Sequence, residues 1–161
     1  MRLGILSDTH DQFARTARAV RILQALGVDA LVHCGDMTSP DVVHACAGVL
    51  PAYFVFGNND YNEKGLRQAI SLIGGICLEH AGSFELGGRI FAVTHGDSNR
   101  QIQSLLQNSP DYLLFGHWHL PTDRREGKTR YINPGALHRA EQWTVATLEI
   151  ETDTLSFHQV T

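Results

Sequence analysis

The first half of the chain alternates short apolar segments with amphipathic ones, and this alternation narrows the choice of folds. Residues 1–6, 29–34 and 52–56 are short and apolar, which is typical of buried strands. Apolar residues recur every three or four positions in residues 11–27, 39–49 and 66–73, which indicates helices with one buried face. Strand–helix–strand units join parallel strands, so we expect an α/β fold that begins with a parallel sheet.

The expected helix ends carry ordinary start and stop signals. Asp11 is predicted to cap the first helix, and Ser39 followed by Pro40 is predicted to begin the second. Gly27 is predicted to end the first helix, and Gly74 the third, because glycine readily adopts the left-handed conformation found beyond a helix end.

The second half is richer in short strands. Residues 83–86 and 89–94 flank Gly87–Gly88, a pair that tolerates the positive φ of a tight hairpin turn. A short helix with Ile102, Leu105 and Leu106, ending near Pro110, and a buried strand over 111–115 follow. Two more hairpins are predicted, over residues 122–132 and over residues 143–160 around Asp153. We expect these antiparallel strands to extend or cover the parallel sheet.

Length and charge exclude several classes of protein. The chain has 161 residues, which fits one domain over 1–161. The net charge is −4 and no polybasic run occurs, so binding along nucleic acid or on an anionic membrane is not expected. No membrane-length apolar run or secretory signal is evident, and the three cysteines suit buried thiols. These features predict a cytoplasmic location.

Five of the predicted strands end in short segments rich in Asp, Asn, His and Gly. These segments are Asp8–Thr9–His10, Gly35–Asp36, Gly57–Asn58–Asn59–Asp60, His95–Gly96–Asp97 and Gly116–His117–Trp118–His119. In open α/β sheets, ligands bind beyond the carboxyl ends of the strands, so we expect the five segments to converge. Asp8 with His10, and His117 with His119, stand two positions apart, and in an extended backbone their side chains would point the same way.

The residue types at these strand ends indicate a metal centre. Carboxylates, imidazoles and an amide, without a thiolate, suit manganese, iron, nickel, cobalt or zinc better than calcium or a structural zinc. Seven potential ligands are too many for one tetrahedral ion, and they suffice for two ions that share a carboxylate. Turn chemistry explains Asp and Asn at strand ends, but it does not require the histidines.

In this order, the five segments resemble the motifs of the calcineurin-like metallophosphoesterases. The resemblance continues to Asn133–Pro134–Gly135, and the short length is most similar to the small prokaryotic phosphodiesterases of the YfcE type. It implies a four-layer α-β-β-α sandwich, in which two mixed sheets are flanked by helices. It also implies hydrolysis of a phosphate ester by a hydroxide that bridges two divalent metal ions, with manganese expected.

The resemblance also assigns roles to individual residues. Asp8, His10 and His119 would hold the first ion, Asn58, His95 and His117 the second, and Asp36 would bridge them. Asn58, Asn59 and His95 would contact the phosphate. Two divalent ions, two carboxylates and one hydroxide leave a formal charge of about +1, which a phosphodiester monoanion would neutralise. A small or nucleotide-like phosphodiester is therefore the expected substrate.

One departure from the family pattern affects the chemistry. Many relatives have a histidine where this chain has Asn59, and that histidine is thought to protonate the leaving oxygen. An amide can donate a hydrogen bond to a phosphoryl oxygen, but it is not a general acid. Asp60 then has no histidine to orient, and we expect it to anchor its loop. His33, inside a strand, is expected to be structural or to support a metal ligand through a hydrogen bond.

Other functions remain open at this point. The chain could be a phosphomonoesterase, or a protein or dinucleotide phosphatase, on the same metal centre. The family also includes a scaffold that uses the fold for protein binding, although such a protein would be expected to have lost ligands. Small members of the family often associate, so a homo-oligomer is also compatible with the sequence.

Overall fold

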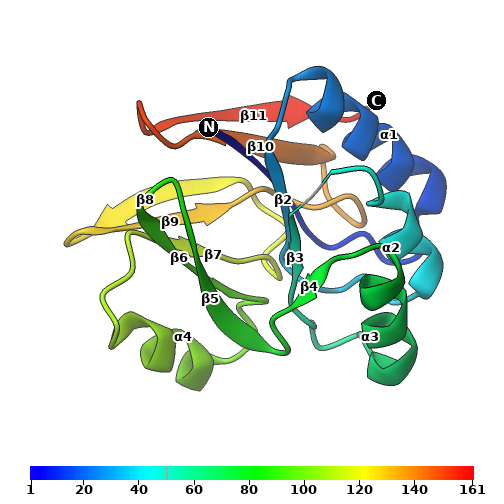
Figure 1. Cartoon of the computed structure of the whole chain (residues 1–161), viewed down its shortest axis with the longest axis horizontal. Helices are drawn as coiled ribbons and strands as arrows, with labels where there is room; N and C mark the ends of the chain where they lie inside the picture. The colour runs from blue at the N-terminus through cyan, green and yellow to red at the C-terminus, as the bar shows by residue number, and fades with distance from the viewer. Residues whose placement is uncertain (50) are drawn as a thin grey trace.

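The computed structural model describes residues 1–49 and 51–161 (Figure 1). In these residues the helices are α1 (Phe13–Ala25), α2 (Pro40–Ala45), α3 (Glu63–Leu72) and α4 (Asn99–Leu106). The first sheet contains β1 (Arg2–Leu6), β2 (Ala30–His33), β3 (Ala52–Phe54), β4 (Ile76–Cys77), β10 (Thr144–Glu149) and β11 (Thr154–Gln159). The second sheet contains β5 (Ala81–Leu86), β6 (Arg89–Thr94), β7 (Tyr112–Leu114), β8 (Thr122–Glu126) and β9 (Thr129–Asn133).

Both sheets are mixed. In the first, β1 to β4 lie side by side and parallel, as the strand–helix alternation predicts, and β10 and β11 extend the sheet antiparallel beyond β1. In the second, β6, β7 and β9 are parallel, and the hairpin partners β5 and β8 form the two edges. The three predicted hairpins are therefore confirmed, and two of them belong to a second sheet.

The burial pattern places the sheets between two layers of helix. On β1, Leu3 and Ile5 pack in the apolar cluster that also contains Phe91 and Val93 of β6, so this cluster lies between the sheets. Leu6 faces the other way, into a cluster with Leu23 of α1 and residues of α2 and α3. A smaller cluster joins the outer face of the second sheet to α4. Figure 1 shows α1 to α3 on one side and α4 on the other, so the expected α-β-β-α sandwich is confirmed.

Three local predictions differ from the structure. Gln12, rather than Asp11, caps α1, because Asp11 still has the left-handed φ of 59° that belongs to the preceding loop. The second helix ends at Ala45, and Gly48 follows with a φ of 96°, so the turn toward β3 starts before Val49. The two-residue strand β4 is not predicted, since so short a pairing depends on its neighbour β3. None of the helices in residues 1–49 and 51–161 is long and apolar enough to cross a membrane.

Candidate metal centre

The loops that follow β1, β2, β3, β6 and β7 meet at one edge of the sandwich. In each sheet these strands are parallel, so their carboxyl ends lie on the same side. Backbone hydrogen bonds tie the loops together: the amide of Asp8 donates to the Gly35 carbonyl at 3.0 Å, and the amide of Gly116 donates to the His95 carbonyl at 2.9 Å. Both sheets therefore contribute side chains to one site.

Two buried carboxylates form the middle of this site, and three imidazoles surround them. The Nε2 atoms of His10 and His95 each lie 3.3 Å from Oδ2 of Asp36. Nε2 of His119 lies 3.0 Å from Oδ1 of Asp8. Asp8, His10 and His119 form one group with possible metal-binding atoms within 4.8 Å of one another, and Asp8, Asp36 and His95 form a second. Asp8 is common to both groups.

Hydrogen bonds on the far side of two imidazole rings fix which nitrogen faces the carboxylates. Nδ1 of His95 donates to the Cys34 carbonyl at 2.8 Å, and Nδ1 of His119 donates to the Arg139 carbonyl at 3.2 Å. A carbonyl only accepts hydrogen bonds, so the proton of each neutral ring is on Nδ1 and the Nε2 lone pair faces a carboxylate. Such an arrangement of lone pair and anion is stabilised by a proton or a metal ion between them.

Burial strengthens this preference for a proton or a metal ion. The Nε2 atoms of His10 and His95 are both buried and without a hydrogen-bond partner within the described residues. Burial disfavours the charged His95 ring, but Asp36 and Asp8 outweigh it and raise the pKa of His95 to about 9. Burial likewise opposes ionisation of Asp36, yet the adjacent imidazoles of His10 and His95 hold the pKa of its carboxyl well below its usual range. The donor set therefore fits divalent metal ions, which would replace these protons.

Two of the predicted metal ligands lie at the rim. His117 is exposed, its ring centroid lies 5.1 Å from that of His95, and its backbone amide donates to Oδ2 of Asp8 at 3.0 Å. Asn58 follows β3 and is exposed. The structure thus gathers the two carboxylates and three of the histidines around one point, places His117 beside His95, and leaves Asn58 exposed.

The two residues after Asn58 interact with Asp36 or its loop. The backbone amide and the side-chain Nδ2 of Asn59 donate to the two oxygens of Asp36, at 2.8 and 2.7 Å. The buried carboxylate of Asp60 accepts from the backbone amides of Asp36, Gly57 and Thr38, at 2.9, 2.7 and 2.6 Å. Burial raises the pKa of the Asp60 carboxyl, although these amides oppose the rise. Asp60 thereby connects the β2 and β3 loops.

The backbone at the ligands is left-handed, which corrects the expectation of extended segments. Positive φ angles occur at five of the seven predicted ligands: Asp8 (53°), His10 (40°), Asp36 (57°), His117 (64°) and His119 (55°). Each such residue costs on the order of 1 kcal/mol, and the loops keep this geometry because ladder hydrogen bonds and packing hold both ends. Side chains two positions apart converge here through tight turns, not through strand periodicity.

Glycines allow the loops to approach closely. A Cβ atom at Gly57 would collide with Asp36, and one at Gly116 would collide with the side chains of Ser7 and Asp8. Any larger residue at these two positions would displace a carboxylate from the centre. The spacing of glycine and ligand in the motifs therefore has a steric cause.

Four further residues support the loops of the site: Ser7 and Thr9 were not identified from the sequence, whereas His33 and Asn133 were singled out there. Ser7 donates through Oγ to Oδ2 of Asp8 at 2.6 Å. Nε2 of the buried His33 pairs with Oγ1 of Thr9 at 3.1 Å, and its Nδ1 accepts from the Gly35 amide at 3.2 Å. Nδ2 of Asn133 donates to the Gly116 carbonyl at 2.7 Å. Ser7 and Thr9 lie in the same motif as Asp8, so their polar character was the available signal.

Comparisons with known proteins agree with this geometry. The sequence profile of the calcineurin-like phosphoesterase superfamily domain matches residues 1–153. A phosphodiesterase of Methanocaldococcus jannaschii is 28% identical over 141 residues, which cover 84% of this chain and 83% of that protein. The structure of an archaeal phosphodiesterase superposes with a TM-score of 0.90 at 25% identity, over 99% of each chain. The YfcE phosphoesterase of E. coli shares the fold, with a TM-score of 0.72 at 20% identity over 100% of each chain.

These matches confirm the family that the five strand-end motifs resemble. The family is that of the calcineurin-like phosphoesterases, and the acidic and imidazole groups gathered here are those that a divalent metal ion would bind. The chain belongs to the calcineurin-like phosphoesterase superfamily.

Proposed function

We propose that this protein is a dinuclear metal-dependent phosphodiesterase that acts on a small or nucleotide-like ester. The observation that carries the proposal is the pair of buried Nε2 atoms, on His10 and His95, which face the same carboxylate without a partner in the described part of the chain. Lone pairs on both sides of one shared anion suit two cations better than one.

The assignment of ligands follows the two groups. Asp8, His10 and His119 would hold one ion, and this set coincides with one of the two groups of potential ligands. Asn58, His95 and His117 would hold the other, and Asp36, which lies 3.3 Å from both His10 and His95, would bridge them. Manganese is the expected metal, with iron, nickel, cobalt and zinc as alternatives, because the donors are oxygen and imidazole nitrogen.

The protein side chains have distinct parts in the proposed reaction. Divalent ions in such a site supply an activated water at neutral pH and positive charge for the phosphoryl oxygens. Nδ2 of Asn59, which in this structure lies on Asp36, would donate to a phosphoryl oxygen beside Asn58 and His95. Asp60 would act through its backbone contacts, by holding the β2 and β3 loops at a fixed separation.

A metal-supplemented screen of phosphodiesters against phosphomonoesters tests this proposal. We expect bis(p-nitrophenyl) phosphate to be hydrolysed faster than p-nitrophenyl phosphate with manganese, and neither to be hydrolysed after chelation. Asp36→Asn should lower the rate by more than about a hundredfold, because it removes the shared charge. Asp41→Asn, an exposed position on α2, is the matched control and should keep full activity.

Two other functions are separated by the same experiment. A preference for the monoester would favour a phosphomonoesterase or phosphatase on this centre. A pure protein that binds no metal by elemental analysis, and that hydrolyses neither ester, would favour a protein-binding scaffold. The two groups of potential ligands, which share Asp8, argue against the scaffold.

A further inference from the structure

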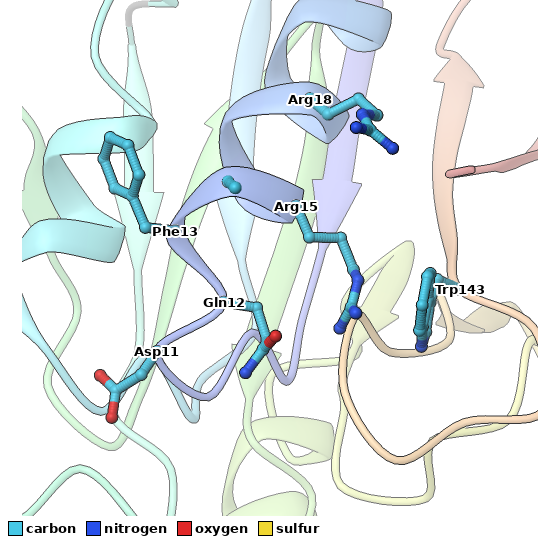
Figure 2. A pocket seen from close by; sticks show the side chains of 7 residues that line it. Asp11, Gln12, Phe13, Arg15, Arg18 and Trp143 are labelled. Carbon is cyan, nitrogen blue, oxygen red and sulfur yellow. The ribbon is translucent and has the colours of Figure 1, made fainter.

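A second site lies directly beside the metal centre and has no part in holding the ions. It is a groove of about 470 Å³ between the first turns of α1 and Trp143, the residue before β10. Its walls are Asp11, Gln12, Phe13, Ala14, Arg15, Arg18 and Trp143. Figure 2 shows Arg15 and Arg18 extending to the same side of α1, with the Arg15 guanidinium alongside the Trp143 ring.

The groove is joined to the metal centre by direct contacts. Nε2 of Gln12 donates to the His10 carbonyl at 3.3 Å. A guanidinium N–H of Arg15 donates to the Leu137 carbonyl, and the Leu137 amide donates to the Asp8 carbonyl at 3.2 Å. A substrate group bonded to a phosphate at the metal centre would therefore enter this groove after a few bonds.

The groove carries two guanidinium groups that no acidic side chain of the described residues neutralises. The guanidinium of Arg15 donates to the Leu137 carbonyl and that of Arg18 to an oxygen of Thr161, the last residue, and neither pairs with an acidic side chain among the described residues. Asp11 also lines the groove, but Figure 2 shows its carboxylate turned away from both guanidinium groups. Burial and the charge of Arg18 lower the pKa of Arg15, which reflects two cations placed close together.

The first turns of α1 add to this positive field. A helix N-terminus favours anions and disfavours cations, yet α1 has no acidic residue in its first turn and has Arg15 there. An anion in the groove would offset this unfavourable charge at the start of α1.

Arg15 is also fixed in position. Its guanidinium lies 3.3 Å from the centre of the Trp143 ring, and its hydrogen bond to Leu137 sets its orientation. A guanidinium that is held on one face and one edge still has N–H groups free for a phosphate, with little entropy left to lose on binding. The side chain of Arg18 is more exposed and supplies a second donor group one turn further along α1.

We propose that the groove formed by α1 and Trp143 binds a second phosphate, carried by the alcohol part of the substrate. This inference rests on the proposed function, because it names the class of diester that the metal centre would receive: a phosphodiester in which one alcohol carries a further phosphate. Arg15 and Arg18 are the specificity-determining residues, and the metal centre acts on the other phosphate.

Binding to the chelated protein tests the groove without any turnover. Thymidine 3′,5′-bisphosphate and thymidine 5′-monophosphate differ only by the second phosphate, and calorimetric titration gives the affinity for each. We expect the bisphosphate to bind about tenfold more tightly to the unaltered protein, in line with one charge-assisted contact. Arg15→Gln and Arg18→Gln should each bring this ratio close to one. Arg21→Gln, an exposed arginine of α1 outside the groove, should keep it.

Hydrolysis then separates this inference from the proposed function. The p-nitrophenyl ester of thymidine 5′-phosphate is compared, with and without a 3′-phosphate, in the manganese-loaded protein. A higher kcat/KM for the 3′-phosphorylated ester that is lost in Arg18→Gln supports the groove. Equal affinities for the two nucleotides, or a ratio unchanged in both variants, overturns the groove and leaves the phosphodiesterase untouched. Loss of hydrolysis of both esters with the affinity ratio intact overturns the phosphodiesterase and leaves the groove.

Discussion

At the scale of single residues, this site is built from hydrogen bonds that fix protons as well as positions. The Cys34 carbonyl puts the proton of His95 on Nδ1, and the Arg139 carbonyl does the same for His119. Each ring is therefore oriented and given its tautomer before a metal ion arrives. Single substitutions at Asn59 and His33 test two further consequences of such bonding.

Asn59 determines which leaving groups the enzyme can release. Its amide donates a hydrogen bond to Asp36 but is no general acid, so the hydrolysis rate should fall steeply as the leaving-group pKa rises. Asn59→His should speed the hydrolysis of alkyl esters by roughly a hundredfold and change p-nitrophenyl esters little, since general acids contribute about 10²–10⁴-fold.

The measurement is a plot of log kcat against leaving-group pKa for both proteins. Asn108→His, an exposed position after α4, controls for an added histidine elsewhere. A shallow slope in the unaltered protein would show that another group already supplies the proton.

His33 makes the fold sensitive to acid. Burial lowers the pKa of His33 to about 3, and the neutral ring pairs with Thr9 and accepts from the Gly35 amide. In an unfolded chain histidine is protonated near pH 6.5. The stability that neutral His33 contributes to the fold is therefore fully present above about pH 6.5 and is lost as the pH falls toward 3. At about pH 5 the loss from this residue is roughly 2 kcal/mol.

Urea unfolding at several pH values measures this loss. His33→Gln should be less stable near neutral pH, by about 1–2 kcal/mol for the disturbed hydrogen bonds, and should lose less stability on acidification. Parallel pH curves for the two proteins would refute the assignment.

At the scale of elements, the loops between strands and helices are strained, and specific side chains hold them. Asp60 is the clearest case, because its carboxylate accepts backbone amides from both the β2 and the β3 loops. The left-handed ligand residues next to it depend on such contacts to keep their conformation.

Asp60→Asn should disturb both loops. One carboxylate oxygen becomes an NH₂ group that faces a backbone N–H, so one donor is left unsatisfied and the free energy of unfolding should fall by about 2 kcal/mol. Manganese affinity should fall by about 10–100-fold, as is typical when a residue that supports metal ligands is changed. Calorimetric titration measures the affinity, and Asp97→Asn, an exposed position, is the control. An unchanged affinity would show that the loops hold without Asp60.

At the scale of the whole molecule, the metal centre joins the two sheets. Asp8 and Asp36 come from the first sheet, and His95, His117 and His119 from the second. In the absence of metal, protonated imidazoles would balance the buried carboxylates across this junction. Metal binding, folding and pH should therefore be linked.

The metal-free protein should lose stability as the pH rises. The pKa of His95 is raised to about 9, above the value near 6.5 expected in an unfolded chain. The stabilisation that protonated His95 gives to the folded protein is thus fully present below about pH 6.5. It disappears as the pH passes about 9, which is a loss of roughly 3 kcal/mol.

Manganese should reverse this dependence, because it displaces the protons and binds more tightly as the pH rises. Free manganese at about a hundred times its Kd adds roughly 3 kcal/mol. Thermal unfolding at pH 6 and pH 9, with manganese and with chelator, measures both effects. Identical pH dependence in the two conditions would contradict the linkage.

The sequence by itself determined the succession of strands and helices, because hydrophobic periodicity is a local property of the chain. It also determined which residues stand at the strand ends, and hence the ligand types of Asp8, His10, Asp36 and His95. The order of those segments also indicated the calcineurin-like phosphoesterase family, and the match to the family's sequence profile confirms this assignment.

The tertiary structure alone decided the features that need contacts between distant segments. The hairpin β8–β9 joins the second sheet only because β9 pairs with β7, and β4 exists only beside β3. Other loops supply the carbonyls that fix the protons on His95 and His119. They also supply the backbone amides that bind the Asp60 carboxylate and the contacts that keep the ligand residues in left-handed turns. The groove between α1 and Trp143 has the same origin, because its walls come from opposite ends of the chain and meet only through the packing of β10 against β1.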